Sequence, residues 1–160
     1  MHDRIERIED LAGTAASELT RHSHPMLLLD ELVEASSSHA VCTWRAPSTC
    51  PIRGGEFGVP AYVSIECMAQ CIAVLAGARA RMKGQQPPLG LLLGTRHFST
   101  RKSHLQTGIV YRVTCRELVR NSEGLASFKC TFAEAGGTIS SCQLAVFESQ
   151  PGEILNESDS

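Results

Sequence analysis

Glu66 is the residue whose surroundings in the sequence most need a chemical explanation. It lies within a long apolar run whose other conspicuous polar side chains are Tyr62, Ser64 and Gln70. A carboxyl group among apolar side chains is costly unless it is paired or protonated, and a protonated carboxyl can act as a general acid. In a helix, Gln70 would share a face with Glu66, within reach of a hydrogen bond. The alternative is a structural glutamate, satisfied by Gln70 or by a backbone group across a subunit interface.

His22 is the second residue that could carry chemistry. It stands just before Pro25, which excludes the helical conformation for the residue before it and ends the preceding helical pattern. A loop beside a rigid proline can present an imidazole in a fixed orientation, although an ordinary surface histidine is the alternative. No metal-ligand spacing is found among the remaining candidates, which are His24, His39, His97 and His104.

One long helix is expected to hold Glu66. Residues 61–82 are apolar on nearly every side and begin directly after Pro60, a residue suited to the first turn of a helix. Basic residues and then Gly84 follow, as is typical of a helix C-terminus. A helix that is apolar around its whole circumference is buried, so other elements must wrap around it.

Extended segments flank this helix on both sides in the sequence. An amphipathic helix over residues 3–20 is expected to open the chain, and residues 47–58 are expected to form a long loop. The strand pattern predicts strands at residues 26–35, 39–46, 89–98, 108–119, 124–134 and 138–148. An α+β architecture accounts for this order, with one curled antiparallel sheet wrapped around the helix. We expect a single domain over residues 1–148 and a flexible tail over residues 149–160.

Composition excludes several classes of protein. The chain has 160 residues and a net charge of −2, which gives no electrostatic footprint for nucleic acid. No apolar run is long and uninterrupted enough to indicate a membrane span. The seven cysteines are odd in number and contain no Cys-x-x-Cys pair, so neither a disulfide framework nor a zinc site is expected. Reduced core thiols in a cytoplasmic protein are the expectation.

Three segments carry a resemblance to a known family. Residues 22–30 read HSHPMLLLD and resemble the His-x-x-Pro-[Phe/Met]-Leu-Leu-[Val/Leu]-Asp segment of hot-dog-fold 3-hydroxyacyl-acyl-carrier-protein dehydratases. Residues 59–70 read VPAYVSIECMAQ and resemble the central-helix motif of that family, Pro-Gly-Val-x-x-x-Glu-x-Met-Ala-Gln. Residues 90–96, GLLLGTR, are similar to a subgroup linked to aryl-polyene-type biosynthesis. The resemblance extends over residues 20–148.

The resemblance implies a dehydration reaction. His22 would be the base that removes the proton alpha to the thioester carbonyl, and Glu66 the acid that protonates the leaving hydroxyl group. The two would meet across a homodimer-like interface. Free backbone N–H groups at the start of the helix would bind the thioester oxygen, and the implied substrate-binding residues are Pro60, Ala61, Tyr62 and Gln70. No metal or organic cofactor is implied, because the substrate arrives on the phosphopantetheine of an acyl carrier protein.

Two departures from the family pattern leave other functions open. Ala61 replaces the glycine of the family, and GGEFG at residues 54–58 replaces its usual His-Phe-Pro-Gly loop. Both are compatible with altered substrate shape. Both also fit a weakly active or non-catalytic subunit that completes a heterodimeric dehydratase. A hot-dog acyl thioesterase, which would release a free acid, is the third alternative.

Docking of an acidic carrier protein needs basic residues at the mouth of the acyl tunnel. The first candidates are Arg96, Arg101 and Lys102. A second set, at the end of the long helix, consists of Arg79, Arg81 and Lys83. An ordinary solvated surface is the alternative for both sets.

Overall fold

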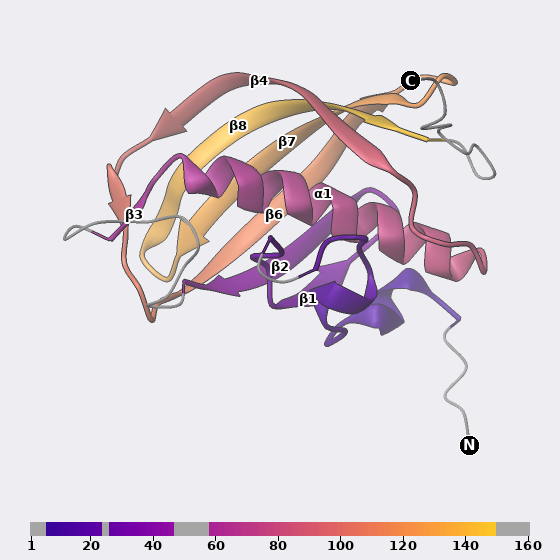
Figure 1. Ribbon diagram of the computed structural model, residues 1–160, viewed down its shortest axis with the longest axis horizontal. Helices are drawn as coiled ribbons and strands as arrows, with labels where there is room; N and C mark the ends of the chain where they lie inside the picture. Colours follow the sequence, from indigo (N-terminus) through magenta and orange to yellow (C-terminus); the bar gives the residue numbers. More distant parts are fainter. Residues whose placement is uncertain (1–5, 24–25, 47–57, 150–160) are drawn as a thin grey trace, which may run out of the picture.

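The computed structural model describes residues 6–23, 26–46 and 58–149, which form a curled antiparallel sheet around one long helix (Figure 1). The strand order in this sheet is β1-β2-β6-β7-β8-β4, and every neighbouring pair is antiparallel. Its strands are β1 (Glu31–Ala35), β2 (His39–Arg45), β4 (Gly90–Thr100), β6 (Val110–Arg120), β7 (Leu125–Glu134) and β8 (Gly137–Glu148). The predicted architecture is confirmed.

The helix α1 (Val63–Met82) lies in the concave face of the sheet (Figure 1). It begins at Val63 rather than at Ala61, because Pro60 belongs to the short strand β3 (Val59–Pro60). This strand pairs with β5 (His104–Leu105) in a separate sheet that the sequence analysis did not predict. A proline can occupy an edge strand because it has no N–H to leave unpaired there.

Most side chains of α1 are buried, as its apolar pattern predicted. By length and composition α1 could cross a membrane, but 72% of its most apolar window is buried inside the fold, as in the core helix of a globular domain. One stripe is less covered than the rest. Glu66, Ala69 and Ala73, at helical spacing, are only half-buried.

The N-terminal segment differs from the predicted amphipathic helix. Two short 3₁₀ helices, η1 (Ile8–Leu11) and η2 (Ala16–Glu18), stand in its place. Gly13 separates them with a φ of 91°, a conformation that favours glycine. The backbone around Gly13 is bonded to β1, because its N–H donates to Leu32 O and the Leu32 N–H donates to Thr14 O. A continuous helix would have used these groups internally.

The predicted strand at residues 26–35 is also shorter than expected, since only Glu31–Ala35 is a strand. Leu27, Leu28 and Leu29 are buried, but they precede the ladder. The predicted loop at residues 47–58 lies outside the described residues except for Gly58, and the predicted tail does so beyond Ser149.

The two edges of the main sheet are covered differently. The N-terminal segment bonds along β1, as described above. Within the described residues no strand pairs with the outer edge of β4. Leu91, Leu92 and Leu93 of β4 are 50%, 44% and 55% exposed. A long, apolar, unpaired edge strand is a ready surface for another chain.

Six of the seven cysteines lie in the described residues, and all six are buried. Five of them are free thiols, namely Cys42, Cys71, Cys115, Cys130 and Cys142. The prediction of reduced core thiols is confirmed for these five. Burial raises the pKa of the Cys71 thiol, so it behaves as a small neutral side chain.

Candidate active site

A pocket of about 400 Å³ follows the half-buried stripe of α1. It is lined by residues of α1, including Glu66, Gln70 and Ala73, and by Leu91 and Leu92 of β4. His22 lies at its rim, from the loop that follows η2. The two residues that the sequence analysis selected for acid–base chemistry therefore line one pocket of the same chain. The resemblance had implied that they would meet across a homodimer-like interface.

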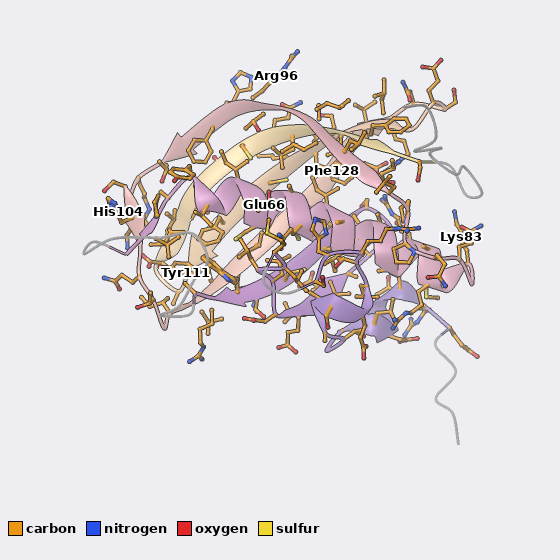
Figure 2. The ribbon with its side chains drawn as sticks, viewed as in Figure 1. Glu66, Lys83, Arg96, His104, Tyr111 and Phe128 are labelled. Carbon is orange, nitrogen blue, oxygen red and sulfur yellow. The ribbon has the colours of Figure 1, made fainter. Side chains whose placement is uncertain are left out.

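Glu66 occupies the first turn of α1 and is half-buried (Figure 2). The expectation of a helix buried around its whole circumference is therefore wrong at Glu66, because the stripe of α1 that carries Glu66 faces the pocket. An acidic side chain in the first turn is stabilised by the positive end of the helix dipole. Glu66 Oε1 accepts a hydrogen bond from Gln70. The other carboxyl oxygen makes no hydrogen bond within the described residues, so it can exchange a proton with a substrate.

Gln70 is buried and uses both ends of its amide. Its Nε2 donates to Glu66 Oε1 at 3.0 Å and to Met26 O at 2.8 Å. Its Oε1 accepts from the Leu28 N–H at 2.8 Å. These bonds join α1 to the segment that follows the His22 loop. The predicted contact between Gln70 and Glu66 is confirmed, and the geometry adds a positioning role for Gln70.

The other side of the His22 loop rests directly on α1. At Gly77 the backbone carbonyl of Leu19 approaches so closely that a Cβ atom would overlap it. Further along, Arg21 Nε donates to Pro87 O at 2.7 Å. Arg81 Nη2 donates to Glu18 O at 2.9 Å. The imidazole is exposed, but the backbone on which it stands is held at several points.

Pro60, Ala61 and Tyr62 do not line this pocket, although the resemblance implied that they bind substrate. The Ala61 N–H donates to Ser103 O at 2.9 Å, so it is not a free donor for a thioester oxygen. Pro60 pairs with His104 in the small sheet, and the Tyr62 side chain is 62% exposed. The Ala61 N–H is therefore excluded as an oxyanion donor, whereas binding of the thioester oxygen by the other N–H groups at the start of α1 stays a prediction. Of the implied substrate-binding residues, only Gln70 is at the pocket.

The first set of predicted carrier-docking residues lies elsewhere. Arg101 and Lys102 precede β5 and both lie near Glu134, at 3.7 Å and 2.8 Å. Arg96 is on β4, and none of the three lines the pocket (Figure 2). Their role in docking stays a prediction. Of the second set, Arg79 and Lys83 line a neighbouring groove.

Several residues of the site could not be recognised from the sequence pattern. Leu91 and Leu92 resemble ordinary strand residues, and their exposure follows only from their place on an edge. Gly77 gave one available signal, since glycine inside a helix is unfavourable without a packing reason. Within the described residues no group of three or more His, Cys, Asp or Glu side chains is arranged to hold a metal ion.

Comparisons with known proteins identify the family of this chain. A family model for ApeP-like proteins, described as ApeP dehydratase, matches residues 14–157. No curated protein matches the chain at a significant level.

Solved structures share the fold. A chain of the dehydratase heterocomplex ApeI:P from Xenorhabdus doucetiae has a TM-score of 0.79 and 22% identity, with 85% of this chain and 91% of that chain covered. An HP0420 homologue from Helicobacter felis has a TM-score of 0.62 and 11% identity, with 96% of each chain covered. A hypothetical thioesterase from Streptococcus pneumoniae, solved with coenzyme A, has a TM-score of 0.60 and 9% identity, with 77% and 88% covered.

At these identities the solved structures show the hot-dog fold and no more, so they do not support the thioesterase alternative. The family model, in contrast, spans nearly the whole described chain and both predicted motifs. This chain belongs to the ApeP-like dehydratase family.

Proposed function

We propose that the chain removes water from a 3-hydroxyacyl thioester carried on an acyl carrier protein, giving a trans-2-enoyl thioester for fatty-acid or aryl-polyene biosynthesis. The observation that supports this most strongly is the pocket in which His22 and Glu66 occur together beside apolar walls. The family supports the reaction class, and the shared pocket supports the assignment of His22 and Glu66 as base and acid.

The chemistry balances with these two residues alone. The neutral imidazole of His22 removes a proton from the carbon alpha to the carbonyl, and the electron pair forms the new C=C bond. The bond from the beta carbon to its hydroxyl oxygen breaks, and the Glu66 carboxyl gives its proton to that oxygen, which leaves as water. The proton gained by His22 is then returned to Glu66 through water. Each positioned acid or base contributes typically 10²- to 10⁴-fold to the rate.

The walls of the pocket suit an acyl chain. Ala69, Ala73 and Ala76 of α1 and Leu91 and Leu92 of β4 line it. Small side chains on the helix leave the space, and leucines provide the apolar surface that a hydrocarbon buries.

A second subunit is part of the proposal. Its docking surface is the open edge of β4, where three consecutive leucines are exposed. The similar solved structure is a dehydratase heterocomplex, which favours a heterodimer with another hot-dog subunit over a homodimer. The cytoplasmic location and the absence of a cofactor stay predictions of the same proposal.

The proposal is tested by replacing each of the two reacting side chains in turn. His22→Ala and Glu66→Gln should each lower turnover of a carrier-linked 3-hydroxyacyl substrate at least a hundredfold, with an unchanged circular dichroism spectrum. Glu31→Gln, which removes an exposed carboxylate outside the pocket, is the matched control and should retain wild-type turnover. Turnover within threefold of wild type for either active-site variant would exclude the assigned roles.

A non-catalytic subunit is the second candidate, favoured by Ala61 and by the open β4 edge. The assay is therefore run with the chain alone and with a second hot-dog subunit. Activity that requires the second subunit and survives both substitutions would assign catalysis to the partner. The appearance of free acid instead of an enoyl thioester would favour the thioesterase.

A further inference from the structure

A second groove, of about 770 Å³, opens beside the C-terminal end of α1. Arg21, Ala76, Pro87, Pro88 and Glu148 line both this groove and the active-site pocket, so the two cavities adjoin. A substrate arm that leaves the pocket on this side would enter the groove directly.

The groove is lined by ionised side chains of both signs, and the acidic ones are already paired. Arg79 Nη1 lies 2.7 Å from Glu117 Oε2. Arg120 lies 3.2 Å from Glu117 and 3.1 Å from Glu148. These two arginines and two glutamates compensate one another, and they form a fixed wall between α1, β6 and β8.

Arg21 and Lys83 are the remaining cations of the groove, and within the described residues neither has an acidic partner. Arg21 is held by its Nε bond to Pro87 O, which leaves its two terminal nitrogens available. Lys83 is exposed at the end of α1, and its side chain extends away from the helix (Figure 2). A guanidinium held in place and a flexible ammonium that line one groove are a suitable pair for a phosphate group.

We propose that Arg21 and Lys83 bind the phosphate ester of the pantetheine arm, so that the carrier protein approaches the end of the molecule near Lys83. This inference rests on the proposed function, because it assumes a thioester held between His22 and Glu66. It replaces the surface formed by Arg96, Arg101 and Lys102 as the docking site. Arg101 and Lys102 already share Glu134, and they adjoin β5, which packs against the residues before α1.

The experiment compares two thioesters that differ only in the phosphate group: a 3-hydroxyacyl pantetheine and the corresponding 3-hydroxyacyl phosphopantetheine. The measured quantity is the ratio of their kcat/KM values. The double variant Arg21→Ala with Lys83→Ala should lower the preference for the phosphorylated substrate at least tenfold. The control, Arg112→Ala with Arg116→Ala, removes the same charge from exposed positions on β6 that line neither cavity, and it should leave the ratio unchanged.

The inference is overturned if the ratio is unchanged in the Arg21 and Lys83 variant, or if Arg101→Ala with Lys102→Ala lowers it instead. The carrier-linked substrate and the coenzyme A thioester are then compared in the wild type. A higher kcat/KM with the carrier-linked substrate supports a carrier protein as the source of the phosphate, and equal values assign the groove to a phosphate presented without a carrier.

A failure of the proposed function has a different signature, since the wild type would then turn over neither thioester, with or without a second hot-dog subunit. In that case calorimetric titration of the protein with phosphopantetheine and with pantetheine still tests the groove. Tighter binding of the phosphorylated compound, lost in the double variant, would support the phosphate site, and equal binding would overturn it.

Discussion

Replacing Gln70 by leucine tests how the active site is positioned. Leucine keeps most of the side-chain volume and removes both ends of the amide. The hydrogen bonds to Glu66, Met26 and Leu28 are lost together. These three bonds differ in how easily water can replace them, and that difference sets the expected loss of stability.

Met26 is 67% exposed and Glu66 is half-buried, so water can take the place of the amide at both. Leu28 is only 8% exposed, and its N–H donates to Gln70 Oε1. A buried donor left without a partner costs about 1–3 kcal/mol. We therefore expect Gln70→Leu to lower the free energy of unfolding by about 2 kcal/mol, nearly all of it from the Leu28 N–H.

Urea denaturation measures this loss as a lower midpoint with an unchanged m-value. Gln143→Leu is the matched control. Gln143 is half-buried on β8 and donates one hydrogen bond, to Ser127 Oγ, so its loss should cost less than about 0.5 kcal/mol. A loss in Gln70→Leu no greater than in the control would refute the reasoning.

Activity separates positioning from stability in the same variant. Assayed well below its midpoint of unfolding, Gln70→Leu should lower kcat more than it raises KM, because the amide holds Glu66 and does not need to touch the substrate. Gln70→Glu keeps an acceptor for the Leu28 N–H but places a carboxylate next to Glu66. Its stability relative to wild type should rise as the pH falls and the two carboxyl groups come to share a proton.

Two further predictions concern the framework. Gly77→Ala should destabilise the fold by about 2 kcal/mol in urea denaturation, because the added methyl overlaps Leu19 O, whereas Gly136→Ala should be nearly neutral. Burial opposes ionisation of Glu117, but hydrogen bonds from Arg120 and Arg79 outweigh it and lower its pKa. Glu117→Gln should therefore cost about 0.5–1 kcal/mol at pH 7, after allowance for solvent screening. That difference should begin to shrink below pH 4.5, the ordinary value, as the carboxylate of the unfolded chain becomes protonated, and it should be lost as the pH falls through the lower pKa of the native carboxylate.

The sheet and the central helix were predictable because their patterns are strong and local. The helix has an apolar run with basic residues and a glycine at its end, and the last two strands meet at a glycine pair. These signals fix the type of these three elements, and they place the ends of each element within a residue or two. The order of strands around one helix then leaves little choice of architecture.

The N-terminal segment was not predictable in the same way. Its apolar spacing is helical, but its backbone groups bond to β1 instead. A covered sheet edge depends on a strand that is distant in the sequence, so local periodicity cannot reveal it. The same reason explains why Pro60 appeared to start the helix, since its pairing with His104 joins two segments far apart in the chain.

The candidate site was predictable in its chemistry and less so in its geometry. Glu66, Gln70 and His22 stand out by residue type and spacing, and all three line one pocket. The wall formed by β4 and the adjoining basic groove depend on which strand lies at the edge of the sheet. Residue spacing carries no information about that edge.

The placement of the proposed acid and base on one chain bears on what a partner subunit contributes. If the pair were divided between two subunits, neither chain alone could hold a complete set. Here His22 and Glu66 line the same pocket, but part of its lining is the start of a strand whose leucines remain exposed. The helix stripe that lines it is also only half-buried. A partner on the β4 edge would therefore exclude water from the pocket without adding a reacting group, and removal of water strengthens the electrostatic interactions within it. On this argument an isolated chain should bind the acyl arm weakly and turn it over slowly, and a partner subunit whose own acid and base have been removed should still restore the rate.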